Sequence, residues 1–339
     1  MGSTGEARDR QAGGAVRIAI ASVGGLAFLA ILAVIAIAWY GYREAERDGP
    51  LEEDAIVLLK PGSSVAKIAD ELAGAGAIRQ EALFVAAVRV KGAQGSLKAG
   101  EYRIPAGASI VDVIDLLVEG KSILHYFTAP EGRTTAQILR DIASDTVLVG
   151  DLTEAPLEGE LLPETYGYTR GETRDGMVRT LMAAQDNLVE SLWSGRALDL
   201  PYTTREQAIV LASIVEKETG VPAERPRIAA VFVNRLKRGM RLESDPTVIY
   251  GLTGGEPLGR GLRVSELKKE TPYNTYVVKG LPPTPIANPG RASIEAALNP
   301  ADTQDLFFVA DGSGGHVFAA TLAEHNKNVA KWRRIEGSQ

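Results

Sequence analysis

The sequence predicts an α+β protein that begins with a single transmembrane helix. Three observations support this prediction: an apolar stretch without charge near the N-terminus, a strand-turn-helix pattern that recurs up to residue 142, and clearly marked helices with short apolar segments beyond it. The length allows two domains with cores of their own. We expect a tail, a membrane-spanning helix, a linker, an α+β subdomain and a larger domain of mixed α/β structure, over residues 1–17, 18–40, 41–54, 55–123 and 124–335.

The N-terminal apolar stretch runs from Ile18 to Tyr40 without a charged side chain. A helix of about 20 residues spans a bilayer, so this stretch is long enough. Arginines precede it, whereas those that follow it are mixed with acidic residues, and this bias predicts an N-terminus inside the cytoplasm and a remainder outside. A cleaved signal peptide is the alternative, because Ala36-Ile37-Ala38 resembles a cleavage site, although its apolar region is usually about 7–15 residues long.

Charge and composition exclude several classes of function. The formal charge of −6 and the isoelectric point near 5.4 argue against a general nucleic-acid binder, which needs a basic surface. The chain has no cysteine, so it has neither disulfides nor thiolate metal sites, and an exported location is compatible with this. Because His125, His316 and His325 are too scattered for a metal-site signature, we expect no metal and no cofactor.

A strand-turn-helix pattern recurs three times between residues 55 and 142. The expected strands cover residues 55–59, 101–104 and 124–128. Each is followed by a turn with proline and glycine, and the expected helix N-caps are Ser64, Ser109 and Thr134. The run from Gly62 to Ala69 resembles the start of LysM domains, which bind polymers of N-acetylglucosamine. A small α+β spacer without a ligand is the alternative.

Beyond residue 142, helices are predicted over residues 173–195, 204–219 and 225–238. A further helix is predicted with Asp245 as its N-cap, Pro246 at its first position and Gly251 at its end. The prolines of residues 282–290 predict a stiff loop that can line a groove. The expected elements near the C-terminus are a hairpin of residues 306–310 and 316–319 and a helix capped by Thr321 and Glu324.

The helix that ends near residue 219 places two carboxylates in its last turn. Its start is predicted at Thr203, with Glu206 as the partner in a capping box, and its end at Gly220 and Pro222. The helix dipole disfavours negative charge at the C-terminal end, so a carboxyl group there keeps its proton to higher pH. A carboxyl that is protonated near neutral pH can act as a general acid.

Glu216 and Glu218 are two residues apart and point to different sides of the helix, so they cannot flank one bond together. Glu218 shares its face with the bulky Leu211, Ile214 and Val215, whereas Glu216 shares its face with smaller residues. We therefore favour Glu218 as the acid. The alternative is a solvated helix end with an alternating Glu-Lys-Glu pattern.

Several ordered motifs together resemble a known family. They are Glu158-Gly159-x-Leu161-x-Pro163-Glu164-Thr165-Tyr166, Ala212-Ser213-Ile214-Val215-Glu216-Lys217-Glu218-Thr219, Val231-Phe232-Val233-Asn234-Arg235-Leu236, Ser244-Asp245-Pro246-Thr247-Val248-Ile249-Tyr250-Gly251, Tyr273-Asn274-Thr275-Tyr276, residues 280–290, and Gly314-Gly315-His316-x-Phe318 with Glu324-His325-Asn326. From about residue 18 to 334 the chain resembles the YceG-like, or MltG, family of endolytic murein transglycosylases. One departure is Leu162, where the family usually has an aromatic residue that could stack on a sugar.

The resemblance implies cleavage of the β-1,4 bond between N-acetylmuramic acid and N-acetylglucosamine in nascent peptidoglycan strands, with a 1,6-anhydromuramoyl end as product. In the family the second glutamate of the Glu-Lys-Glu-Thr segment is catalytic, and here that residue is Glu218. It would act first as an acid and then as a base. One carboxyl is sufficient because the nucleophile, the C6 hydroxyl, belongs to the substrate.

Motif position implies four further site residues, which would support the positive charge that develops on the muramoyl ring: Asp245, Glu164, Tyr273 and Asn274. Asp245 could also serve only as a helix cap, and Tyr273 and Tyr276 could be ordinary packing residues. Lys217 and Glu216 are expected to face outward or to support the site from behind.

The expected location is the outer face of the cytoplasmic membrane, where one helix anchors the protein beside nascent glycan strands and the peptidoglycan synthases. Two other functions are compatible with parts of the sequence. A membrane-tethered scaffold would bind peptidoglycan without cutting it, and a lysozyme-type hydrolase would produce reducing ends instead of anhydro ends.

Overall fold

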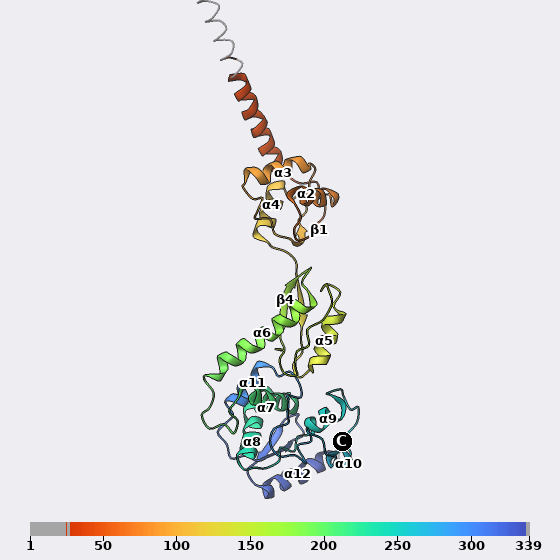
Figure 1. Cartoon of the computed structure of the whole chain (residues 1–339), viewed down its shortest axis with the longest axis vertical. Coiled ribbons are helices and arrows are strands. Elements are labelled where there is room, and N and C mark those ends of the chain that lie inside the picture. The colour runs from red at the N-terminus through yellow and green to blue at the C-terminus, as the bar shows by residue number, and fades with distance from the viewer. Residues whose placement is uncertain (1–24, 26–27, 337–339) are drawn as a thin grey trace, which may run out of the picture. The chain divides into compact units, whose positions relative to one another are not determined.

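The computed structural model describes residue 25 and residues 28–336 (Figure 1). The chain divides into two compact units, Met1–Leu124 and His125–Gln339, which we call unit 1 and unit 2. The predicted tail of residues 1–17 and most of the first part of the predicted transmembrane helix, residues 18–24 and 26–27, lie outside the described residues.

An apolar helix precedes the folded part of unit 1. Its described part runs without interruption from Phe28 to Ala45, and it is long and apolar enough to cross a membrane. Large apolar side chains, such as those of Ile37 and Trp39, are exposed along it. The helix continues past Tyr40, so residues 41–45, which were predicted to belong to the linker, are helical instead.

The remaining linker residues are bound to unit 1. Ala45 is 4% exposed and belongs to the hydrophobic core of the unit. The Gly49 amide donates to the Gly107 carbonyl at 3.0 Å, and the Gly107 amide donates to the Leu51 carbonyl at 2.9 Å. The guanidinium of Arg79 donates to the carbonyls of residues 48 and 49. The helix is therefore joined to unit 1 by a hydrogen-bonded junction.

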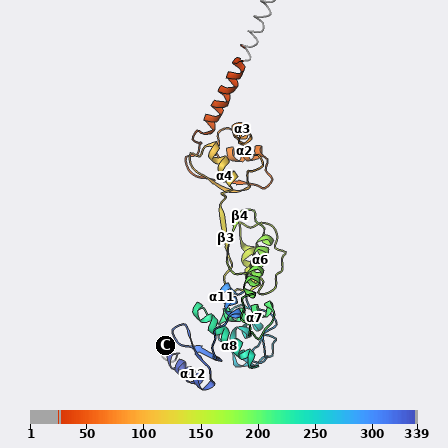
Figure 2. The same cartoon turned by 90° about the vertical axis from the view of Figure 1, so that its left-hand side faces the viewer.

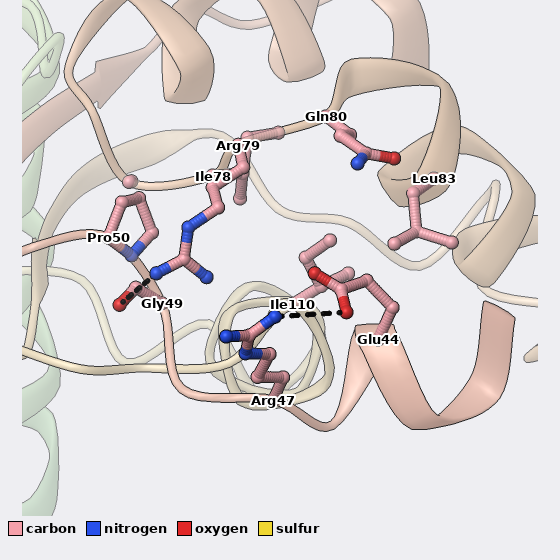
Figure 3. Close-up of a pocket in the computed structure, with 10 residues that line it drawn as sticks. Glu44, Arg47, Gly49, Pro50, Ile78, Arg79, Gln80, Leu83 and Ile110 are labelled. Carbon is pink, nitrogen blue, oxygen red and sulfur yellow. Dashed lines mark hydrogen bonds and ion pairs between the residues drawn. The ribbon is translucent and has the colours of Figure 1, made fainter. Parts of the chain in front are cut away.

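A small pocket lies at this junction (Figure 3). Arg79 reaches across it to the Gly49 backbone, and Arg47 pairs with Glu44 at 3.6 Å. Its volume is about 20 Å³, which is room for one water molecule. It is too small to hold a sugar.

Unit 1 contains a two-stranded antiparallel sheet and three further helices. The elements are β1 (Ala55–Leu59), α2 (Val65–Gly74), α3 (Glu81–Val90), β2 (Gly100–Ile104) and α4 (Ile110–Glu119). Ala55 pairs with Ile104 and Leu59 with Gly100. The predicted caps Ser64 and Ser109 are confirmed, since each hydroxyl accepts a hydrogen bond from the amide three residues on. Helix α3 was not predicted, because its N-cap, Gln80, makes no side-chain capping bond.

The first part of unit 2 contains the third strand-turn-helix copy. The elements are β3 (Leu124–Thr128), α5 (Thr135–Ser144), β4 (Thr165–Thr169) and α6 (Arg174–Trp193). Strand β3 pairs with β4, with α6 beside them (Figure 2). The predicted cap Thr134 is confirmed as part of a capping box with Gln137. The apolar residues of these elements, such as Phe127, Ile138 and Leu181, form one core.

The rest of unit 2 is built around three packed helices (Figure 1). The helices are α7 (Arg205–Glu218), α8 (Arg225–Lys237) and α11 (Arg291–Leu298), and α11 packs on both others. The middle of α7, residues 208–215, is buried. The remaining elements are η1 (Pro222–Glu224), α9 (Asp245–Thr253), α10 (Val264–Leu267), β5 (Phe307–Ala310), β6 (His316–Ala319) and α12 (Leu322–Glu336). The predicted hairpin and the Thr321–Glu324 cap are confirmed.

The prediction of a mixed α/β arrangement for this unit was wrong in detail. The strands described in unit 2 pair in two-stranded sheets, β3 with β4 and β5 with β6, and the helices pack mainly on one another. The unit is therefore of the α+β type, like the chain as a whole. The sequence predicted β3, β5 and β6 but not β4, and the pairing of strands is not encoded in hydrophobic periodicity.

Several helices begin or end at other residues than those predicted from the sequence. The capping box of α7 is formed by Thr204 and Gln207, not by Thr203 and Glu206. The helix ends because Thr219 is extended, with φ −141°, and Gly220 does not adopt a left-handed conformation.

The ends of α9 were displaced as well. The N-cap of α9 is Ser244, not Asp245, so that Asp245 opens the helix and Pro246 follows it. Helix α9 continues through Gly251 to Gly254, whose φ of 67° ends it.

Candidate active site

Glu218 is the last residue of α7, a helix whose preceding turns are buried in the core of unit 2. The apolar face predicted from Leu211, Ile214 and Val215 is fully buried, which fixes the direction of the helix end. The Glu218 residue as a whole is partly exposed, while protein atoms surround its carboxyl group. The hydroxyl of Ser244 donates a hydrogen bond of 2.5 Å to its Oε1.

Burial raises the pKa of the Glu218 carboxyl to about 7. The hydrogen bond from Ser244 lowers it, the negative charge of Asp245 raises it, and His316 and Arg235 lower it. The direction of this shift agrees with the prediction from the sequence, and desolvation is its largest cause. A large fraction of the carboxyl groups are protonated at neutral pH, as a general acid requires.

Ser244 is held by the backbone around it. Glu243, with φ 53°, is the one non-glycine residue with positive φ in the described part of the chain. The Glu243 amide donates to the Thr275 carbonyl at 3.2 Å, and the Ser244 amide donates to the Thr275 hydroxyl at 3.0 Å. Thr275 is 1% exposed. Sequence reasoning missed Ser244, because its partner lies 26 residues away.

Asp245 is exposed at the start of α9, next to Ser244. Its Oδ1 accepts a hydrogen bond of 2.8 Å from the Tyr276 hydroxyl. Burial, together with that bond, raises the pKa of Tyr276, and the charges of Asp245 and Glu218 raise it further. Of the four additional residues implied by motif position, Asp245 is thus the one with an electrostatic effect on Glu218.

A histidine–glutamate pair is bound to the segment that follows α7. Nδ1 of His316 and Oε2 of Glu224 are 2.8 Å apart, and the His316 amide donates to Oε1 of Glu224 at 2.8 Å. The Thr219 hydroxyl also donates to Glu224, at 3.3 Å. These bonds hold the pKa of Glu224 below its usual range although burial opposes them. The pair connects the β5–β6 hairpin to the chain segment that follows Glu218.

Arg235 of α8 is a buried cation near Glu218. It donates to the carbonyls of Leu306 and Leu242 at 2.7 and 2.8 Å, and it pairs with Glu243 at 3.2 Å. Burial lowers its pKa, while the charges of Glu243 and Glu218 raise it. Arg235 therefore fixes the segment before Ser244 and lowers the pKa of Glu218.

Glu216 does not face outward, which was one of the two orientations expected for it. Its side chain is 6% exposed, and its Oε2 accepts from the Gly290 amide at 3.0 Å and from the Ser293 hydroxyl at 2.7 Å. Arg225 lies 3.5 Å from its other oxygen. Glu216 thus attaches α7 to the start of α11. Lys217 is exposed.

The other implied residues lie in different settings. Glu164 is exposed immediately before β4, and its carbonyl accepts from the Ala129 amide. The Tyr273 ring is tilted by 59° against the Tyr250 ring, with centroids 4.9 Å apart, and its hydroxyl is 2.8 Å from that of Thr284. Asn274 is fully buried, and its amide donates to three backbone carbonyls of residues 266–269. Asn274 therefore shapes a loop.

A polar cluster in unit 2 contains Glu158, which is partly buried, and Asn288, which is fully buried in the predicted stiff loop. Oε1 of Glu158 accepts from the Thr135 amide at 2.7 Å and from the Asn288 amide group at 3.2 Å. Burial raises the pKa of Glu158. Gly159 has φ 88°, and a Cβ there would lie 2.6 Å from Pro285.

Leu162, which replaces a usual aromatic residue, is 4% exposed within the core and cannot stack on a sugar from outside.

Together these contacts define a site with one buried carboxyl group, close to half protonated at neutral pH, at the end of a core helix. In the described part of the chain, no cluster of three or more His, Cys, Asp or Glu could hold a metal ion. A carboxyl group in this setting can donate a proton to a substrate and take one back.

Residues 57–331 match the model of the YceG-like family, and the chain belongs to this family. It is 33% identical over 319 residues to an endolytic murein transglycosylase of Bacillus subtilis (strain 168), covering 84% of this chain and 87% of that protein. It is 28% identical over 360 residues to an endolytic murein transglycosylase of Streptococcus pneumoniae serotype 2 (strain D39), covering 90% of this chain and 64% of that protein. A crystal structure of a YceG-like protein from Listeria monocytogenes superposes with a TM-score of 0.51 and 29% identity, covering 81% of this chain and 99% of that one.

Proposed function

We propose that this protein is a lytic transglycosylase that cleaves peptidoglycan strands internally, at the β-1,4 bond between N-acetylmuramic acid and N-acetylglucosamine. Membership of the YceG-like family and the names of the relatives support the proposal. The observation that carries it is Glu218, a buried carboxyl with a pKa of about 7 at the end of a core helix.

In the proposed reaction Glu218 donates its proton to the glycosidic oxygen while the bond between that oxygen and C1 of the muramoyl residue breaks. The C6 hydroxyl of the same residue then bonds to C1, and its proton passes to the Glu218 carboxylate. The products are a 1,6-anhydromuramoyl end and a free hydroxyl on N-acetylglucosamine. No water is consumed, and Glu218 regains its proton.

We assign supporting roles to the residues around this acid. Asp245 is the favoured group to stabilise the positive charge on the muramoyl ring, since it is exposed and adjacent to Ser244. Tyr273 and Glu164 stay assigned to substrate binding by their motif position. Asn274, which is buried and fully bonded, is assigned the role of holding the loop that carries Tyr276.

The test is to incubate the full chain, in detergent, with uncrosslinked glycan strands and to identify the products by mass spectrometry. Anhydromuramoyl ends from the unsubstituted protein and none from Glu218→Gln would support the proposal. Glu270→Gln, which makes the same change at an exposed glutamate, should retain activity. Reducing ends would mean a hydrolase, and binding without cleavage would mean a scaffold.

We further propose that the helix ending at Ala45 anchors the protein in the cytoplasmic membrane, with unit 2 outside. The exposed apolar side chains along this helix support the proposal, since such a surface is unfavourable in water. External protease should digest unit 2 in cells whose wall has been removed. Recovery of a mature chain that begins after Ala38 would instead indicate a cleaved signal peptide.

An anchored enzyme would act on nascent strands beside the synthases and so influence strand length. A chain without residues 1–42 should therefore change the distribution of strand lengths in cells, and an unchanged distribution would count against the anchoring role. As part of the same proposal, residues 55–123, which resemble a LysM domain, bind glycan at a second place on the protein. It predicts that Glu218→Gln still binds glycan strands.

A further inference from the structure

Ser244 occupies a helix N-cap without acting as a side-chain cap. A serine at this position usually accepts a hydrogen bond from the amide two or three residues on. Here the Thr247 amide is bound by the Ser244 carbonyl, and the Ser244 side chain makes no capping bond. Its hydroxyl donates a hydrogen bond of 2.5 Å to Oε1 of Glu218 instead.

The backbone around Ser244 is arranged at an energetic cost. The left-handed conformation of Glu243, with φ 53°, is unfavourable for a residue with a Cβ. Thr275 stabilises it through the bonds to the amides of residues 243 and 244, and its hydroxyl lies 2.8 Å from that of Thr247. Such strain persists only where the surroundings enforce it, and it is concentrated at functional sites. The strained turn gives Ser244 one orientation, toward Glu218.

The direction of this bond has a consequence for the acid. When the carboxyl group is protonated and Oε1 accepts the hydrogen bond of Ser244, Oε1 is the carbonyl oxygen and the proton of the group is on Oε2. We propose that Ser244 is a positioning residue that, by donating to Oε1 of Glu218, confines the transferable proton to Oε2. This inference rests on the proposed function, in which that proton goes to the glycosidic oxygen.

The test compares Ser244→Ala and Ser244→Cys with a control, Ser213→Ala. Cysteine keeps the shape of serine with a much weaker donor. Ser213 is a fully buried serine of α7 whose hydroxyl contacts Val210 and Ile286, not Glu218. Turnover should fall about tenfold to a hundredfold in Ser244→Ala and less in Ser244→Cys, at unchanged KM. Ser213→Ala should leave both unchanged once the folded fraction is accounted for.

The pH dependence separates positioning from mere stability. The Ser244 bond lowers the pKa of Glu218, so its loss should move the decline of activity at alkaline pH to higher pH. A carbon-13 NMR titration of the Glu218 carboxyl should show the same upward shift without any turnover. Equal turnover in all three variants, or an unshifted titration in Ser244→Ala, would overturn the inference. A shifted titration in a protein that forms no anhydro ends would leave the contact in place and refute the proposed function.

Discussion

The hydroxyl of Tyr276 donates a hydrogen bond of 2.8 Å to Oδ1 of Asp245, the residue that directly follows Ser244. Ser244 and Asp245 act on the pKa of Glu218 in opposite directions. The hydrogen bond from the Ser244 hydroxyl lowers this pKa, and the negative charge of Asp245 raises it. Tyr276 holds the Asp245 carboxylate in place. The protonation of one carboxyl group is thus adjusted by two consecutive residues at the start of α9.

Asp245→Asn should lower the pKa of Glu218, because it removes a nearby negative charge. The decline of activity at alkaline pH should then begin at lower pH than in the unsubstituted enzyme. The rate of anhydromuramoyl formation between pH 5 and 9 measures this, with exposed Asp302→Asn as the control. A decline that stays in place or moves to higher pH would contradict the assigned effect of Asp245.

The stability of the protein should depend on pH through Glu218. Its pKa is about 7 in the folded protein and about 4.5 in an unfolded chain, so between these values the folded state binds the extra proton. The free energy of unfolding therefore falls as pH rises through this range, by about 3 kcal/mol for this group. Glu218→Gln lacks this loss and should be more stable than the unsubstituted protein at pH 8, but not at pH 4. Urea unfolding at the two pH values measures this, and an equal difference at both would refute the prediction.

Glu216→Ala should destabilise the protein by about 3–5 kcal/mol. It removes the acceptor of the Gly290 amide and the Ser293 hydroxyl and leaves Arg225 with a buried charge less well compensated. Thermal unfolding measures the loss, and Lys217→Ala, at the exposed position between the two glutamates, should change stability by less than about 0.5 kcal/mol. Loss of turnover at full stability would instead assign a catalytic role to Glu216.

Gly159→Ala should destabilise unit 2 more than Gly150→Ala. Both glycines have positive φ, 88° and 75°, so both substitutions carry a conformational penalty of about 1 kcal/mol. Only at Gly159 would the new Cβ also collide with Pro285, at 2.6 Å, whereas nothing lies within 4 Å at Gly150. The difference between the two variants in denaturant unfolding isolates the packing of the proline loop. Equal losses would mean that the loop yields without cost.

Local signals in the sequence predicted much of the fold. Ser64, Ser109 and Thr134 were identified as caps because each stands between a proline–glycine turn and an apolar helical pattern. Where two capping residues are adjacent, the prediction was displaced by one residue, from Thr204 to Thr203 and from Ser244 to Asp245. Helix α11 was missed because Gly290 gives it no side-chain cap.

The candidate site could be predicted only in part. The apolar face of α7 predicted the burial of the helix in front of Glu218, because burial follows helical periodicity. The residues beside Glu216 are buried as well, so burial alone does not distinguish the two glutamates. The donor to Glu218 could not be found in this way, since Ser244 reaches it through a strained residue and a contact with Thr275. Asn274 was expected at the site because of its motif, but the carbonyls it binds belong to its own loop.

The junction at Ala45 determines how an anchored form of this protein could move. A flexible tether would let a domain sample a volume whose radius grows with the number of free residues. Here the last helical residue is already a core residue, and the amides and carbonyls that follow are bonded to unit 1. With the helix in a bilayer, as proposed, no flexible tether would separate it from the folded part of unit 1. The distance of unit 1 from the lipid would then vary little, because the last helical residue is already part of its core.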